Sequence, residues 1–194
     1  LHTATLVHDD IIDNSDLRRG KTTVNVAWSN SHGVLIGDFI YSKAFMLMNE
    51  IGNFKVIDEL SSATNKIAEG ELMQLANKNN LNTSLQQLKK ISYYKTGRLF
   101  EASAKSAAML SGKSIPFIEN ISKAAKLIGI AFQVRDDLLD YGVSKGNIGK
   151  PEMQDILEDK ITYPLYFALK YSNKKDSSKI LKKLKNKDFS LEEV

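Results

Sequence analysis

The sequence predicts an all-α fold, and three observations support this prediction. Only three prolines and 11 glycines interrupt the 194 residues, and the stretches between them carry apolar residues at helical spacing. No segment shows the alternation of apolar and polar residues that is typical of a half-buried strand. A chain of this length can bury one sizeable core, so we expect a single domain over residues 1–194.

Breakers and caps set the expected helix boundaries. A first helix is expected to end near Asp13, and a second to begin near Val34 after a long loop. A Gly-Asn turn at 52–53 separates the second from the third, and Thr83 or Ser84 can cap a later one. Pro164 is expected to bend the last segment into two short helices. The predicted helical segments are 1–13, 34–51, 55–77, 85–110, 117–141 and 156–172.

Composition excludes several classes of function. There are no cysteines and only three histidines, so disulfides and thiolate metal sites are excluded and any metal must be held mainly by carboxylates. The net charge is +4, but residues 171–194 alone hold seven lysines and four acidic residues. We interpret that excess as a solvated segment and expect no nucleic-acid partner. We find no signal peptide and no apolar run of transmembrane length.

An aspartate-rich motif, Asp-Asp-x-x-Asp, occurs twice. The outer aspartates of each copy are four residues apart and share one helical face, where like charges destabilise a helix. Both copies are also expected near helix C-terminal ends, where the dipole disfavours anions. A bound cation relieves both costs, and oxygen ligands favour a hard ion such as Mg²⁺. The candidate metal residues are Asp9, Asp10 and Asp13 in the first copy, and Asp136, Asp137 and Asp140 in the second.

Basic residues accompany both motifs. Arg18, Arg19 and Lys21 follow the first within one loop, Lys95 precedes a Thr-Gly pair, and a third group follows the second motif: Lys145, Lys150 and Lys160. Cations beside magnesium carboxylates suit a diphosphate. The alternative for a single motif is a solvated acidic helix end, and for a single lysine it is an ordinary surface charge.

Four segments together resemble the trans-isoprenyl diphosphate synthase family: HTATLVHDDIIDNSDLRRG, AEGELMQL, YYKTGRLFEASA and AFQVRDDLLDY. The match extends from residue 1 to about residue 170. Within the family, the chain resembles above all the octaprenyl-type synthases, which supply quinone side chains. The resemblance implies an isoprenoid synthase bundle around a deep apolar cavity, with the two motifs facing each other at its mouth.

The resemblance also implies a role for each candidate residue. Asp9 and Asp13 would bind Mg²⁺ from one wall and Asp136 from the other, with Asp10, Asp137 and Asp140 in support. The allylic diphosphate would be held by Arg18 and Lys95, with Lys150 and Lys160, and isopentenyl diphosphate by Arg19 and His2. Thr96 and Gln133 would flank the developing allylic cation. Together with Lys95 they form the implied catalytic set.

The same resemblance bears on product length. In the family, aromatic residues four and five positions before the first aspartate plug the cavity and give short products. Here those positions are Thr5 and Ala4, which implies a long product, with Phe45, Met46 or Met48 as candidates for the cavity floor. For Ala4 the alternative is that it is simply a good helix former.

Two departures from the family pattern follow the second motif. Met153 and Asp159 stand where the family often carries glycine. These differences bear on the conformation of the loop and on the part that Lys160 plays in it. The chain also begins inside an amphipathic pattern and ends on DFSLEEV, so we expect a fragment truncated at both ends.

The sequence also bears on the assembly of the protein and on competing functions. The resemblance implies a homodimer. The absence of cysteines and of apolar spans fits a cytoplasmic location, near a membrane that receives the product. A terpene cyclase is a competing interpretation, but cyclases generally lack the paired arginines and the second motif. A weakly active or regulatory subunit of a heteromeric synthase is another, and the intact aspartates of both motifs argue against it.

Overall fold

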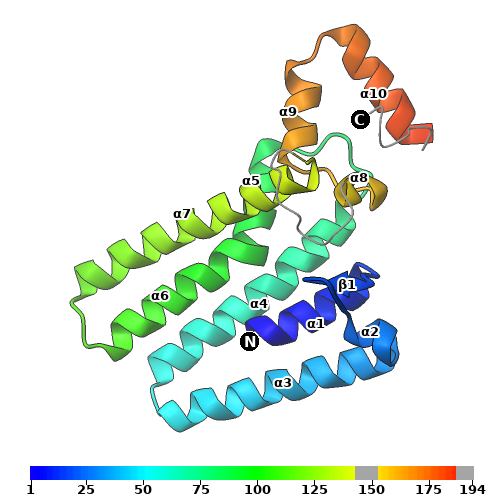
Figure 1. Ribbon diagram of the computed structural model, residues 1–194. Helices are drawn as coiled ribbons and strands as arrows, with labels where there is room; N and C mark the ends of the chain where they lie inside the picture. The colour runs from blue at the N-terminus through cyan, green and yellow to red at the C-terminus, as the bar shows by residue number, and fades with distance from the viewer. Residues whose placement is uncertain (143–152, 187–194) are drawn as a thin grey trace.

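The computed structural model describes residues 1–142 and 153–186, and helices dominate these residues (Figure 1). The expectation of an all-α fold is confirmed. The helices are α1 His2–Ile12, α2 Val24–Ala27, α3 Asn30–Ile51, α4 Phe54–Ala76, α5 Leu85–Ser92, the π-helix η1 Tyr93–Gly97, α6 Arg98–Leu110, α7 Ile115–Asp140, α8 Gln154–Leu157, α9 Tyr163–Tyr171 and α10 Lys174–Asn186.

Local capping chemistry explains where several helices begin. Helix α3 begins at Asn30 and not at Val34, because the Ser29 side chain accepts a hydrogen bond from the His32 amide at 3.3 Å. Helix α5 has the expected Ser84 cap, completed by Gln87 as a capping box. The prediction of a start at 117 for α7 was wrong by two residues, because Pro116 stands in its first turn, where its missing N–H costs nothing.

Two further predictions were wrong. The loop after α1 contains a small antiparallel hairpin of β1 Leu17–Arg18 and β2 Lys21–Thr22. Its two-residue turn places Arg19 and Gly20 at positive φ, as a tight hairpin requires. The last segment does form two short helices, α8 and α9, but Pro164 does not bend them apart. It stands in the first turn of α9, and the break falls earlier, over residues 158–162, where Asp159 has a positive φ.

The long helices pack side by side and direct three of their C-terminal ends toward one end of the molecule. Helix α6 packs against both α4 and α7, η1 lies between α4 and α7, and α1 packs against α3. In Figure 1 the C-terminal ends of α1, α4 and α7 lie toward the right, near the hairpin and α8. Both aspartate motifs therefore lie at helix C-terminal ends at this end of the bundle.

Small side chains dominate the interior between the central helices. Ala63 of α4, Ala102 of α6 and Ala125 of α7 are buried, which lets the backbones approach closely. A second, separate core joins α8 to α9 and α10 around Ile156, Ile161 and Leu165. In the described part of the chain, no helix combines the length and the apolar character needed to cross a membrane.

Candidate active site

The first aspartate motif lies at the C-terminal end of α1. Asp10 is buried and receives Arg18 from the hairpin, whose Nε lies 2.8 and 3.0 Å from the two carboxylate oxygens. This pair anchors the hairpin to α1 and keeps Arg18 beside the motif. Asp9 and Asp13 are only partly buried, so their carboxylates face the end of the bundle more openly than Asp10 does.

The second motif divides its three aspartates between different environments. Asp137 is buried and accepts hydrogen bonds from Gln133 Nε2 at 2.9 Å and from the Tyr163 amide at 3.4 Å. Asp140 accepts the amides of Gln154 and Asp155, both at 3.0 Å, and so caps the start of α8. Asp136 is the exposed member of the motif.

The π-helix brings the expected catalytic residues to the same end of the bundle. Lys95 pairs with Glu71 of α4 at 2.9 Å and also donates to Gln74. Thr96 Oγ1 donates to Gln133 Oε1 at 2.6 Å. Since Gln133 in turn donates to Asp137, one hydrogen-bonded row leads from η1 into the second motif.

The segment between α8 and α9 touches both motifs. Lys160 is 9% exposed, and its Nζ lies 2.9 Å from Asp13 of the first motif and 2.5 Å from Glu158. Three residues later, the Tyr163 amide bonds Asp137 of the second motif. A cavity of about 30 Å³ lies between these groups, lined by Gln74, Lys95, Gln133, Asp137, Lys160 and other residues.

Carboxylates crowd this end of the molecule, and their pKa values reflect it. Burial raises the pKa of Asp9 to about 6, with a further contribution from nearby Glu71. Burial likewise raises the pKa of Asp137 to about 6, although the hydrogen bond from Gln133 opposes the shift. The charge of Lys95 lowers the pKa of both aspartates, so this lysine lies within electrostatic reach of both motifs.

The pKa values of two other groups at this end, Asp155 and Lys160, are also shifted. Burial raises the pKa of Asp155 to about 7, and the carboxylates of Asp140 and Asp137 add to the effect. Burial alone would lower the pKa of Lys160, but Asp13 and then Glu158 outweigh it and raise this pKa above its ordinary value. Burial is thus the largest contribution to the raised pKa values of these aspartates, and neighbouring carboxylates add to it.

The side chains at this end of the bundle offer the type of donor atom that a hard divalent cation prefers. Carboxylate oxygens are the ligands that Mg²⁺ and Ca²⁺ prefer. A cation near Asp9 would offset both the burial of its carboxylate and the repulsion from Glu71, which together raise its pKa. Among the described residues, no three acidic or histidine side chains stand grouped as a ready-made metal centre. The ligand type therefore fits, while the predicted roles of the individual aspartates stay predictions.

Other predicted residues lie at the edge of the site or outside the described ranges. His2 is largely exposed at the start of α1. Partial burial of its ring, followed by the charges of Arg19 and Arg18, lowers its pKa. Arg19 is exposed in the hairpin turn. Lys145 and Lys150 fall within 143–152, outside the residues that the structure describes.

Sequence reasoning missed the partners of the expected cations. Glu71 and Gln74 hold Lys95 from α4, and Asp155 lies beside the second motif. The spacing of Glu71 and Gln74 by three residues, on one face of a long helix, was a signal that could have found them.

Comparison with known proteins decides the family. The sequence profile described as polyprenyl synthetase matches residues 1–194. This chain belongs to the polyprenyl synthetase family. The resemblance inferred from the four segments is thereby confirmed, and the isoprenoid synthase fold is shared with solved structures of the family.

Individual members of the family are similar over most of the chain. The octaprenyl diphosphate synthase of Escherichia coli (strain K12) is 42% identical over 180 residues, which cover 93% of this chain and 56% of that protein. A decaprenyl diphosphate synthase structure from Rhodobacter capsulatus is 36% identical with a TM-score of 0.90, covering 98% of this chain and 60% of its own. A Caulobacter crescentus polyprenyl synthase, solved with calcium and isoprenyl diphosphate, is also 36% identical, with a TM-score of 0.91 and coverage of 97% and 58%. The chain thus spans little more than half the length of the curated relatives that it matches.

Proposed function

We propose that the protein to which this chain belongs condenses isopentenyl diphosphate with an allylic prenyl diphosphate and makes a long-chain all-trans polyprenyl diphosphate. The observation that carries the proposal is the gathering of both aspartate motifs, Lys95 and Lys160 at one end of the helical bundle of a polyprenyl synthetase family member. The named octaprenyl and decaprenyl synthases among its relatives support a long product for quinone side chains.

The proposed residue roles follow the charges of the site. Asp9 and Asp13 hold divalent metal from α1 and Asp136 from α7, with Asp10, Asp137 and Asp140 in support. Lys95, Arg18 and Lys160 bind the allylic diphosphate, together with Lys150. Arg19 and His2 bind isopentenyl diphosphate. Lys95 and Lys160 are now paired with carboxylates, so substrate and metal binding would exchange these ion pairs for contacts to phosphate and metal.

The proposed metal is Mg²⁺, since carboxylate oxygens are its preferred ligands. When bound, it supplies Lewis-acid stabilisation of the charge on the departing diphosphate. The calcium complex of the Caulobacter relative supports a divalent cation in this family.

The chain's own residues account for the remaining steps. The ammonium groups of Lys95 and Lys160 stabilise the negative charge that develops as the allylic carbon–oxygen bond breaks. The oxygens of Thr96 and Gln133, already joined at 2.6 Å, face the resulting allylic cation. The double bond of isopentenyl diphosphate attacks the cation, and the proton then lost passes to the released diphosphate. Apolar walls exclude the water that would trap the cation.

Assembly and location belong to the same proposal. On the family resemblance we propose one catalytic domain in a cytoplasmic homodimer, with the product delivered to a membrane. Light scattering of the purified full-length protein tests the dimer directly.

Activity is tested on the full-length protein with labelled isopentenyl diphosphate, farnesyl diphosphate and Mg²⁺, with the product sized by chromatography. We expect a polyprenyl diphosphate of long chain, and a loss of at least about a hundredfold for Asp9→Asn, because it weakens the metal site. Hydrocarbon products would indicate a cyclase. Activity only after addition of a partner subunit would favour the regulatory-subunit interpretation, and either result would overturn the proposal.

A further inference from the structure

The π-helix η1 is the unusual element of this site. It covers Tyr93–Gly97 and interrupts what would otherwise be one helix from α5 through α6. A π-helix is rare because its wide turn takes in an extra residue, and such turns are often associated with function. Here the wide turn carries Lys95 and Thr96, whose side chains reach Glu71 and Gln133.

The extra residue decides where these two side chains point. Each residue of an α-helix advances by about 100° around the helix axis. If the wide turn relaxed to α-helical geometry, its residues would therefore rotate about the axis by about that angle relative to the neighbouring helices. Lys95 would then turn away from α4 and Thr96 away from Gln133. The register of η1 is therefore a requirement of the proposed site.

Tyr93, the first residue of η1, is bonded to the helix that follows, α6. Its hydroxyl donates to Glu101 Oε2 of α6 at 2.6 Å, and Lys126 of α7 lies 4.1 Å from the centre of its ring. Burial and then the Glu101 carboxylate raise the pKa of Tyr93 to about 12, so its proton stays in place as the donor. Because the bond joins residues eight apart across the wide turn, it restrains the length of helix between them.

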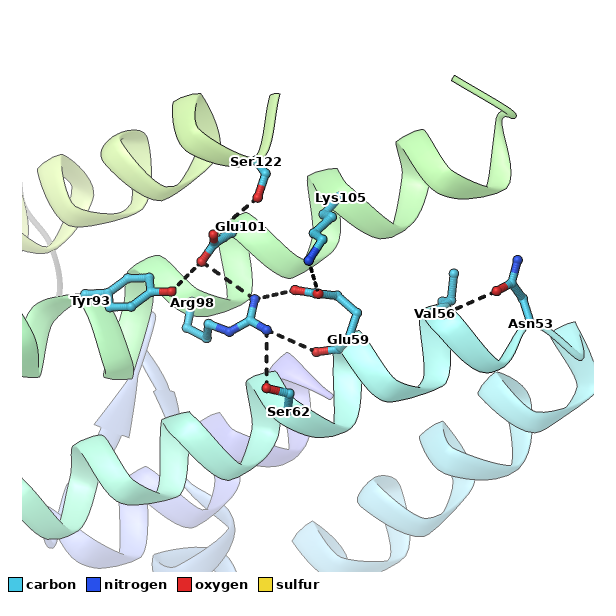
Figure 2. Close-up of polar contacts among 9 residues, drawn as sticks. All are labelled: Asn53, Val56, Glu59, Ser62, Tyr93, Arg98, Glu101, Lys105 and Ser122. Carbon is cyan, nitrogen blue, oxygen red and sulfur yellow. Dashed lines mark hydrogen bonds and ion pairs between the residues drawn. The ribbon is translucent and has the colours of Figure 1, made fainter. Parts of the chain in front are cut away.

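Glu101 is itself held by a buried network, shown in Figure 2. Its other oxygen accepts from Ser122 of α7 at 3.2 Å, and Arg98 Nη1 lies 3.6 Å from Oε2. Arg98, 8% exposed, donates to Glu59 Oε1 of α4 at 2.5 Å, and Lys105 Nζ lies 2.5 Å from Glu59 Oε2. The acceptor for Tyr93 is thus bonded directly to Ser122 of α7 and connected through Arg98 to Glu59 of α4.

The network is separate from the proposed chemistry. In the described part of the chain, the side-chain hydrogen bonds and ion pairs of Tyr93, Glu101, Arg98, Glu59 and Lys105 involve no aspartate of either motif and neither Lys95 nor Thr96. The backbone amide of Arg98 bonds the Thr96 carbonyl, and this contact lies at the end of η1 itself. Glu59 has its full charge compensated by Arg98 and Lys105, unlike the crowded carboxylates at the end of the bundle. These residues therefore act on the site only through η1.

We propose that Tyr93 and Glu101 are positioning residues, whose hydrogen bond, anchored through Arg98 to Glu59, holds η1 in the π-helical register that presents Lys95 and Thr96 to the allylic diphosphate. The inference rests on the proposed function. It adds residues that touch neither substrate nor metal but set the geometry of those that do.

The test uses Tyr93→Phe in the full-length protein, which removes the hydroxyl and keeps the ring beside Lys126. We expect kcat to fall about tenfold, an order of magnitude in line with small displacements of positioned groups, while the KM for isopentenyl diphosphate changes less than about twofold. We expect the affinity for inorganic pyrophosphate, measured by calorimetry, to fall with kcat. Amide hydrogen exchange in residues 93–98 should become faster.

Ser122→Ala is the matched control, because it removes a hydrogen bond to the same Glu101 carboxylate from α7 and leaves η1 untouched. We expect its melting temperature to fall comparably and its kcat, pyrophosphate affinity and exchange at 93–98 to stay within about twofold of wild type. Equal effects of the two variants, or unchanged kcat and exchange in Tyr93→Phe, would overturn the positioning role. A wild-type protein without prenyl transfer would instead overturn the proposed function, and the calorimetry and exchange comparisons would still decide the role of Tyr93.

Discussion

Two non-glycine residues near Lys160 adopt left-handed backbone conformations. Met153 has φ 62° and Asp159 has φ 61°, and these are the two positions where the family resemblance implies glycine. The loop thus keeps the conformation that glycine would favour, although its residues are not glycine. Side chains with a Cβ pay about 1–2 kcal/mol in this region, and aspartate pays less than most.

Two substitutions of Asp159 distinguish the effect of its strained backbone on stability from the effect of its side chain. We expect Asp159→Gly to have a free energy of unfolding about 1 kcal/mol higher than Asp159→Ala, because both lose the carboxylate and only alanine keeps the strain. Denaturant titration of the two variants measures the difference. Equal stabilities would show that the positive φ carries no cost here.

The predicted determinants of product length, Ala4 and Thr5, differ in their surroundings. Ala4 has no exposed surface, whereas Thr5 is partly exposed and lies one helical turn before Asp9. A phenylalanine at position 4 would overpack the interior at a cost of about 1–3 kcal/mol. The structure therefore makes Thr5 the position for a length test. Of the candidate floor residues on α3, Met48 is buried and Met46 is exposed.

We expect Thr5→Phe to shorten the polyprenyl product, because the ring would stand beneath the aspartates of α1. Thr3→Phe is the control, since Thr3 is exposed on another face of the same helix. Chromatography of the products of the full-length variants measures chain length. A product of wild-type length from Thr5→Phe would contradict the predicted role of this position in limiting product length.

At the scale of elements, close backbone contacts hold η1 between two helices. A Cβ on Gly129 of α7 would lie 2.6 Å from Gly97 Cα, and one on Gly70 of α4 would lie 2.9 Å from the Lys95 amide nitrogen. Backbone atoms cannot move aside as a flexible side chain can. These glycines allow α4 and α7 to approach the π-helix from both sides.

Alanine at Gly129 should therefore destabilise the fold despite its better helix propensity. We expect a loss of about 2 kcal/mol or more in the free energy of unfolding, in the range for overpacked cores. Gly33→Ala is the comparison, because its Cβ would meet side chains and no backbone, with the end of the Ile11 side chain nearest. We expect it to be near neutral, since about 0.5–1 kcal/mol of helix propensity offsets the contact. Thermal unfolding tests the order of the two variants.

The buried network between α4 and α6 predicts a dependence of stability on pH. Burial works to raise the pKa of Glu59, but hydrogen bonds from Lys105 and Arg98 outweigh it and lower this pKa below 4.5. The charged form is therefore favoured in the folded state, so its stabilisation is present above pH 4.5 and is lost as pH falls through the lowered value.

We expect Glu59→Gln to lower the free energy of unfolding by about 3 kcal/mol near pH 7, because the buried Arg98 then keeps only the more distant Glu101 carboxylate as a counter-charge. The difference from wild type should narrow below pH 4.5. Urea titrations at several pH values measure it. A difference that stays constant through the acid range would show that the charge of Glu59 is not the cause.

At the scale of the whole molecule, Lys160 joins distant parts of the chain. Its Nζ bonds Asp13 across 147 positions of sequence, and its neighbours Ile156, Ile161 and Leu165 form the core beneath α10. The segment from α8 to α10 is thus fastened to the first aspartate motif by one buried ammonium. This contact closes the end of the bundle where the site lies.

Lys160→Met should loosen this attachment, because it leaves Asp13 and Glu158 facing each other without a cation. We expect a loss of about 2–4 kcal/mol in stability, near the range for breaking a buried pair. Lys170→Met is the control, since Lys170 is exposed and contacts only the rings of Tyr166 and Tyr171 in the described structure. Comparable melting temperatures for the two variants would show that the Lys160 pair does not hold the segment.

The sequence by itself determined the helical class, the boundaries of the long helices α1, α4 and α7 to within about two residues, and the two aspartate motifs. These features rest on local physics: apolar spacing, caps such as Ser84, and like charges at helix ends. The Lys95–Thr96 pair and Gln133 were also found from sequence, through resemblance, and the structure joins Thr96 to Gln133 at 2.6 Å. The start of α3 was missed because Ser29 is one of several possible caps in a polar loop.

Only the tertiary structure decided which charges meet. Lys160 and Asp13 are 147 residues apart, and no local pattern relates them. The π-helical register of η1 depends on Gly70, Gly129 and the Tyr93–Glu101 bond, which belong to four helical elements. The pKa of Asp9, and the capping role of Asp140 at α8, depend on burial and on neighbours brought near by packing. Local sequence selects helices, but burial and contact between helices set the electrostatics of the site, because both are properties of the packed chain.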